Sequence, residues 1–205
     1  MTVPNNSPTQ SIVDLRIPLA EKAIRALRYG QRVSLSGILY TARDAAHKYL
    51  AGTAPALPPG LQLAGSALYH CGPVMVRDGS SGQWRVTAAG PTTSGREEPY
   101  MAEVIRRYGI RAIIGKGGMG ARTLQALQEY GCVYLSAVGG AAQVLAAAVQ
   151  CVNRVYFLEK FGSPEAMWEL QVKDFPAIVT MDTHGGNLHD EVFKISQERK
   201  DGLKD

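Results

Sequence analysis

Three short segments of the sequence each combine glycine or hydroxyl residues with one cationic side chain, and each precedes a predicted helix. The cations are Arg43, Arg96 and Lys116. A helix N-terminus offers free backbone N–H groups and the positive end of a dipole, so cations near such ends favour bound anions. Together the segments predict a pocket for a phosphate or a small dicarboxylate, although each alone is equally well explained as a helix cap with a turn. The segments are Thr41–Asp44, Gly90–Arg96 and Gly115–Gly120.

The third segment also raises the alternative of a nucleotide site. Gly115–Gly120 fits GxGxxG between a predicted strand and a predicted helix, as a dinucleotide fold requires. The next predicted strand, 132–136, lacks the terminal Asp or Glu that binds ribose hydroxyls. Gly117 follows Lys116 where a P-loop needs Ser or Thr, which excludes that motif. A nucleotide-binding oxidoreductase therefore stays a minor alternative.

Cysteines and histidines lack the spacing of a metal site. Cys71, Cys132 and Cys151 form no CxxC pair and lie in apolar segments, so we expect them to be reduced and mostly buried. Three thiolates would also suffice for a four-iron cluster with one open iron, which is the less favoured alternative. No pair of histidines has convincing ligand spacing, and none is taken as a site residue. The histidines are His47, His70, His184 and His189.

The composition is that of one globular domain. The chain has 205 residues, 45% of them hydrophobic, which is enough for a sizeable core. Its 22 basic and 18 acidic residues are spread out, without a basic track for nucleic acid. No stretch approaches the roughly 20 apolar residues of a membrane span, and the N-terminus lacks a signal-peptide layout. We expect one cytoplasmic domain over 1–205, with a loose arm at 1–10, a charged tail at 196–205, and neither nucleic-acid nor membrane partners.

The periodicity of apolar residues predicts a β-rich start followed by strands that alternate with helices. Capping-box spacing predicts helix starts at Thr41 with Asp44 and at Ser94 with Glu97. The alternating second half is typical of a parallel sheet with helical crossovers. The expected strands are 12–17, 32–40, 67–71, 110–114, 133–135, 155–158 and 175–180; the expected helices are 21–27 and 42–50 and those that start after 94, at 121 and at 141, with C-caps at Gly109 and Gly131.

Read together, the three cationic segments resemble the signature segments of class I fumarase C-terminal domains and of their separate beta subunits, in the same order and spacing. The resemblance covers nearly the whole chain and extends to the beta subunit of L(+)-tartrate dehydratase. It implies an α/β fold, the swivelling β/β/α three-layer domain, with a largely parallel sheet and helical crossovers. Further similar segments are Val138–Ala142, Glu165–Trp168, Asp174–Val179 and Gly186–Asn187.

The same resemblance implies a hydro-lyase that divides its active site between two parts. An alpha-type domain or subunit holds a 4Fe-4S cluster on three cysteines, and the beta part contributes substrate-binding groups but no cluster of its own. Removing water from a 2-hydroxy dicarboxylate needs a Lewis acid and a base, which makes such a division sensible. We expect activity only with an alpha subunit, as a heterodimer or an α2β2 heterotetramer. Malate and fumarate are the first expectation; tartrate dehydration and a non-catalytic anion-binding or assembly module are the alternatives.

Carried onto this sequence, the resemblance implies that Arg43, Thr92, Thr93, Arg96 and Lys116 bind the substrate. Thr92 resembles the proposed base of the family, and Lys116 would assist the chemistry. A threonine hydroxyl is a poor base unless a neighbour takes its proton. Thr92 as base and Thr92 as a simple binding or capping residue therefore stay open as comparable readings.

One departure from the family pattern follows Arg96. The family commonly has Met-Asp or a close variant there, whereas this chain has Glu97-Glu98-Pro99. Two extra acidic side chains beside a dicarboxylate pocket leave the substrate open. We also expect exposed apolar surface where the partner binds.

Overall fold

The computed structural model describes residues 11–53 and 56–201. The expected arm at 1–10 and the last four residues of the expected tail lie outside the described residues. The strands are β1 (Val13–Arg16), β2 (Arg32–Thr41), β3 (Ala67–Tyr69), β4 (Val74–Arg77), β5 (Trp84–Ala88), β6 (Ala112–Gly115), β7 (Val133–Ser136), β8 (Val149–Tyr156) and β9 (Met167–Met181). The helices are α1 (Glu21–Arg25), α2 (Asp44–Thr53), the 3-10 turn η1 (Ser94–Arg96), α3 (Glu98–Tyr108), α4 (Ala121–Tyr130), α5 (Ala142–Ala147), α6 (Leu158–Phe161) and α7 (Leu188–Asp201).

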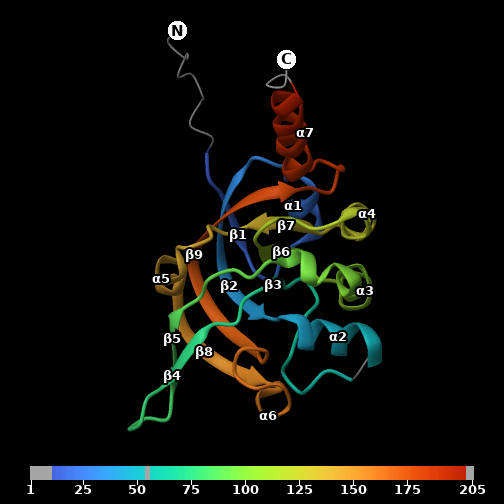
Figure 1. Ribbon diagram of the computed structural model, residues 1–205. Coiled ribbons are helices and arrows are strands. Elements are labelled where there is room, and N and C mark those ends of the chain that lie inside the picture. The colour runs from blue at the N-terminus through green and yellow to red at the C-terminus, as the bar shows by residue number, and fades with distance from the viewer. Residues whose placement is uncertain (1–10, 54–55, 202–205) are drawn as a thin grey trace.

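Five strands form a closed ring. β2, β3, β6 and β7 pair in parallel, and β9 closes the ring by pairing antiparallel with both β7 and β2. β1 and β8 extend the sheet beyond the ring, and β4 and β5 form a projecting hairpin (Figure 1). The predicted mixed α/β fold with a mostly parallel sheet and helical crossovers is confirmed. The structure differs from the expected stack of separate sheet layers. A single sheet curves round until its long last strand, β9, pairs with β2.

Alternating side chains of the ring strands face two separate hydrophobic cores. On β6, Ile114 belongs to the first core and Ile113 to the second; on β7, Leu135 and Tyr134 divide in the same way. The second core lies under α2, α3 and α4, which gather on one side of the strands (Figure 1). The helical members of that core are Ala46, Leu50, Met101, Val104, Ile105, Ala126 and Leu127.

The order of elements largely follows the sequence prediction, and the differences lie at strand lengths, at β8 and at the C-terminus. The strand expected at 155–158 shares only two residues with β8 and runs into α6. Gly109 and Gly131 end α3 and α4 in the left-handed conformation, as predicted. β9 begins at Met167 rather than at residue 175, because its first half pairs with β8 and β2. Much of the predicted charged tail is part of α7, a helix without buried residues that projects from the body (Figure 1). None of the described helices is both long and apolar enough to span a bilayer.

One glycine in β2 lies where the backbone leaves no room for a side chain. Gly37 has φ +125°, at a register shift in the β2–β9 pairing, and a Cβ there would lie 2.6 Å from the carbonyl oxygen of Ile17. We expect Gly37→Ala to lower the free energy of unfolding by about 2 kcal/mol, because strain and collision add. The control is Gly52→Ala in α2, where an added Cβ would meet no atom within 4 Å. This change is expected to raise the free energy of unfolding by about 0.5–1 kcal/mol. Equal urea midpoints for the two variants would contradict this account.

Candidate functional site

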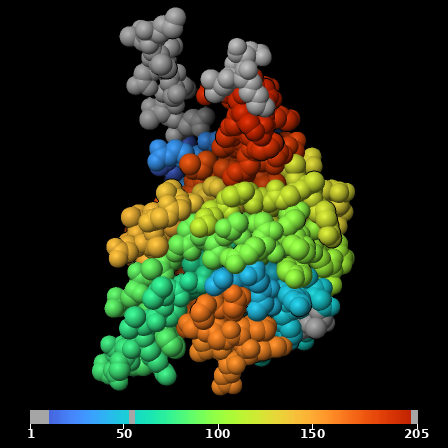
Figure 2. All heavy atoms as spheres, in the orientation of Figure 1, coloured from blue at the N-terminus to red at the C-terminus, as the bar shows by residue number. Residues whose placement is uncertain are grey.

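The first cationic segment joins the end of β2 to the start of α2. Arg43 packs against Gly72, because a Cβ added to this glycine would lie 2.9 Å from Nη1 of Arg43. The Nε atom of Arg43 lies 3.3 Å from Oε1 of Glu165. The second oxygen of Glu165 accepts the backbone N–H of Ala45 at 3.0 Å. Figure 2 shows the segment that precedes β9 lying against the start of α2. Glu165 therefore forms an ion pair with the guanidinium through one oxygen and accepts a hydrogen bond at the beginning of the helix through the other.

The predicted cap of α2 was wrong. Thr41 is buried at the end of β2, where its hydroxyl accepts the N–H of Trp168 at 3.0 Å and donates to the carbonyl of Ala166 at 3.4 Å. The threonine thus joins two strands, and Glu165 supplies the carboxylate at the helix start instead. Sequence spacing within one segment could not reveal a cap that comes from 120 residues away.

The second and third segments lie side by side. The backbone N–H of Ser94 donates to the carbonyl of Lys116 at 3.1 Å, and the N–H of Lys116 donates to the carbonyl of Thr92 at 3.3 Å. Thr93 and Lys116 form an isolated parallel bridge. The structure therefore brings Thr92, Thr93 and Lys116 together, with Thr93 and Lys116 exposed to solvent.

Thr92 is held by a single backbone carbonyl. Its N–H donates to the carbonyl of His70 at 2.7 Å, and its hydroxyl donates to the same oxygen at 3.1 Å. The hydroxyl hydrogen is thus directed at a group that accepts a hydrogen bond but does not take up a proton at neutral pH. The lone pairs of Thr92 Oγ1 remain as its acceptor sites.

A buried hydrogen-bond network lies beneath these loops and is centred on Ser94. The Ser94 Oγ accepts from the hydroxyl of Tyr134 at 2.9 Å and lies 2.8 Å from Nδ1 of His70. No room is left for a side chain at Gly115, where a Cβ would be 1.9 Å from Ser94 Oγ. The predicted role of Ser94 as a helix cap was wrong, since η1 has no side-chain cap bond and α3 begins only at Glu98.

The network continues into α2 through two buried histidines. The rings of His47 and His70 meet edge to face with centroids 4.8 Å apart. His47 Nδ1 lies 2.8 Å from the carbonyl of Arg43, which only accepts, so this nitrogen carries the hydrogen. Burial lowers the pKa of His47 to about 4 and that of His70 well below its usual value, and it raises the pKa of Tyr134 to about 12. The network is therefore uncharged at neutral pH.

Arg96 stands at the edge of this arrangement. Its side chain is 52% exposed, and Nη1 lies 3.9 Å from Oδ2 of Asp44 at the start of α2. Glu97, the next residue, is fully buried. Contacts therefore connect the three segments that carry the predicted site residues: Arg96 pairs with Asp44 beside Arg43, and the Thr92 and Lys116 segments are joined by backbone hydrogen bonds.

The nucleotide alternative meets an obstacle at the start of α4. The carboxylate of Glu98 accepts the N–H of Gly120 at 2.8 Å, the N–H of Thr123 at 3.2 Å and the hydroxyl of Thr123 at 2.6 Å. A dinucleotide fold would place its pyrophosphate on these same groups. A carboxylate from α3 already fills that position, so the glycine pattern serves a turn and a helix contact.

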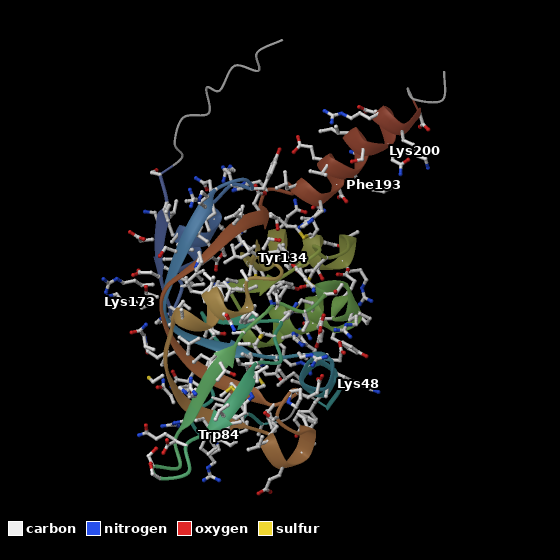
Figure 3. The ribbon with its side chains drawn as sticks, turned by 60° about the vertical axis from the view of Figure 1, so that its left-hand side comes forward. Lys48, Trp84, Tyr134, Lys173, Phe193 and Lys200 are labelled. Carbon is white, nitrogen blue, oxygen red and sulfur yellow. The ribbon has the colours of Figure 1, made fainter. Side chains whose placement is uncertain are left out.

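The sequence also gave no site role to His189. It lies in the first turn of α7, with Nε2 3.1 Å from Oγ1 of Thr180 and its ring centroid 6.1 Å from that of Tyr134. A Cβ at Gly118 would lie 2.5 Å from this ring. The first turn of α7 therefore packs against the loop that carries Lys116. Farther along the same helix, Phe193 projects away from the body (Figure 3). No sequence signal marked this contact, because it depends on how β9 returns to the ring.

The cysteines do not gather into a cluster-binding set. All three are free thiols: Cys71 is buried after β3, Cys132 is buried before β7, and Cys151 is exposed in β8. Burial raises the pKa of the Cys71 thiol to about 12, which disfavours the thiolate that an iron would need. Over residues 11–53 and 56–201, no three His, Cys, Asp or Glu side chains come together as metal ligands.

Comparison with known proteins gives a consistent set of similarities. The family model for the fumarase C-terminus matches residues 2–192. A putative fumarate hydratase class I of Geobacillus stearothermophilus is 52% identical over 95% of this chain, which spans only 37% of that protein. A putative L(+)-tartrate dehydratase subunit beta of Methanocaldococcus jannaschii is 42% identical over 90% of this chain and 95% of its own length. The L(+)-tartrate dehydratase subunit beta of Escherichia coli K12 is 35% identical over 92% of both chains.

Removal of the central hydroxyl tests the network. Ser94→Ala leaves the Tyr134 hydroxyl and His70 Nδ1 without their partner, so the free energy of unfolding is expected to fall by about 1–3 kcal/mol. Ser196→Ala, on the exposed face of α7, is the matched control and is expected to change it by less than about 0.5 kcal/mol. Equal losses in chemical denaturation would show that the buried bonds carry no net stability.

The protonation of the buried histidines is a second test. Side-chain nitrogen NMR spectra are expected to show neutral imidazoles for His47 and His70 down to about pH 5, with the hydrogen of His47 on Nδ1. The urea-unfolded chain is the reference, in which both should titrate near a pKa of about 6.5. Titration of either histidine at its unfolded value in the native chain would contradict the description of the network.

Proposed function

The chain belongs to the fumarase C-terminus family, and we propose that it is the beta part of a hydro-lyase acting on a small 2-hydroxy dicarboxylate. Interconversion of malate and fumarate is the first candidate reaction, and dehydration of L(+)-tartrate to oxaloacetate is the alternative. Relatives with either name support the shared reaction class more strongly than a choice between the two.

The observation that supports the proposal is that the three segments that carry the cations are connected to one another and to one buried network. Arg96 and Lys116 face solvent, and Arg43 forms an ion pair with Glu165. Guanidinium groups bind carboxylates through two parallel hydrogen bonds, while an ammonium acts as a compact charge. Two carboxylates of one substrate, and the negative charge that grows when its C–H proton leaves, match this distribution.

Thr92 and Thr93 would complete the pocket. With its hydrogen directed at the His70 carbonyl, the Thr92 oxygen is suited to accept a hydrogen bond from the substrate hydroxyl. As a base it would first have to release its own proton, which a backbone carbonyl does not take. We therefore propose Thr92 as a binding group, with a group of the partner as the proton acceptor and Lys116 as a cation that stabilises the developing negative charge.

Departure of hydroxide needs an electrophile, and within residues 11–53 and 56–201 no three possible metal ligands, the three cysteines included, come together. We propose that an alpha-type partner carries a 4Fe-4S cluster whose open iron acts as the Lewis acid. The name "subunit beta" of two relatives, and the greater length of the third, support a separate or fused alpha part. A heterodimer or an α2β2 heterotetramer in the cytoplasm is the proposed assembly.

Reconstitution tests this function. The chain is co-expressed anaerobically with an alpha-type partner, and absorbance of the unsaturated product is followed with malate and with tartrate. Arg96→Ala is expected to lower kcat/KM about a hundredfold, because a cation aimed at developing charge is lost. Arg106→Ala removes an exposed cation of α3 that pairs with Glu103 outside the pocket, and activity should be unchanged. No turnover of either acid with a loaded cluster would favour a non-catalytic anion-binding module.

The role of Thr92 is tested by splitting kcat from KM in the same complex. Thr92→Val keeps the shape of the side chain and removes the hydroxyl, and is expected to raise KM about tenfold with kcat nearly unchanged. Thr92→Ser should remain close to wild type. A loss of about a hundredfold or more in kcat at constant KM would instead identify Thr92 as the base.

A further inference from the structure

A buried acid directly follows Arg96 in the chain and has no assigned role. Glu97 is 0% exposed, at the start of α3, and neither of its carboxyl oxygens has a hydrogen-bond partner among the described residues. One oxygen of Asp44 is buried and lacks a partner as well. Buried polar groups in proteins are almost always paired, so this arrangement calls for an explanation.

Both carboxyl groups bury oxygen atoms without partners, and Asp44 acts on Glu97 through a side-chain hydrogen bond and through its charge. The protonation of the two groups decides whether that hydrogen bond can form. As two carboxylates they would repel, and neither would have a hydrogen to donate. One shared proton resolves this, since a neutral acid donates to its neighbour. Asp44 is the natural carboxylate of the pair because it lies in the first turn of α2 and 3.9 Å from Arg96. Burial, and next the bond and charge of Asp44, raise the pKa of Glu97 to about 8.

We propose that Glu97 is a positioning residue that, as a neutral acid, donates a hydrogen bond to Asp44 and so holds Arg96 at the substrate pocket. The inference deepens the proposed function and rests on it for the identity of the bound dicarboxylate. It also assigns a role to one of the acidic residues that stand where the family commonly has Met-Asp.

The charges around Glu97 set the direction of the pH effect. Asp44 faces it from α2 and favours the neutral acid, while Arg96 from η1 favours the ionised form. His47 of α2 is neutral and Tyr134 of β7 is a phenol at neutral pH. Above about pH 8 Glu97 ionises, the bond to Asp44 is lost, and the pocket gains one negative charge. A dicarboxylate should therefore bind more weakly above this pH, not below it.

The first experiment needs no ligand and uses the full chain. Carbon NMR of the Glu97 carboxyl is expected to report a midpoint near pH 8, and the Nε–H resonance of Arg96 should move with the same midpoint. Glu97→Gln keeps size and donates an amide hydrogen to Asp44 at every pH, so Arg96 should no longer respond. Glu103→Gln removes an exposed acid of α3 and should leave the Arg96 response as in wild type. A Glu97 midpoint at the ordinary value, about 4, would overturn the proposal, and so would an Arg96 resonance that ignores Glu97.

Calorimetry with malate and tartrate separates this inference from the proposed function. Wild-type affinity is expected to fall about tenfold between about pH 6.5 and pH 9.5, while Glu97→Gln keeps its affinity. A parallel fall in both proteins would overturn the role of Glu97. If neither acid binds at any pH while the Glu97 and Arg96 resonances titrate together, the positioning contact stands and the proposed ligand is wrong.

Discussion

The pair of buried hydrogen bonds at Ser94 Oγ is the interaction on which the rest of the site depends. Through it β7, β3 and the loop before α3 are fixed to one another, and the adjacent His47–His70 contact adds the start of α2. The Arg43 carbonyl is bonded to His47, and the Arg96 segment contains Ser94 itself. The Lys116 segment is bonded to the Arg96 segment through backbone hydrogen bonds. The two hydrogen bonds at Ser94 Oγ require glycine at position 115, because any side chain there would displace Ser94. A network of neutral groups also rigidifies the pocket without adding charge that an anion would have to overcome.

The sequence suggested that helix N-termini would bind the anion, and the structure gives a different physical account. The start of α2 is occupied by Glu165 and the start of α4 by Glu98, so the chain satisfies those N–H groups with its own carboxylates. In the proposed site the anion is therefore bound by side chains rather than by these helix starts. Because Glu98 occupies the start of α4, the glycine pattern does not leave a free phosphate position there.

Local patterns were enough to predict most elements and the two helix ends at Gly109 and Gly131, whereas the proposed site residues came from the resemblance of three segments to a known family. Periodicity worked for β6 and β7 because alternate side chains enter two different cores. It could not predict that β9 would close a ring, because closure depends on pairing between distant strands. The same limit hid the network: Ser94 reads as a cap, and only the folded chain brings Tyr134 to it. Glu97 was recognised as unusual, but its burial is a tertiary property.

The most direct test of the central claim is an NMR titration of the full chain with malate and with tartrate, observing the side-chain N–H groups of Arg43, Arg96 and Lys116. If the network joins three segments into one dicarboxylate pocket, one of the two acids will shift all three side chains with a single dissociation constant. The same titration of Ser94→Ala should weaken all three responses together. Responses with separate dissociation constants, or a response from only one of the cations, would contradict the claim that these segments form one site.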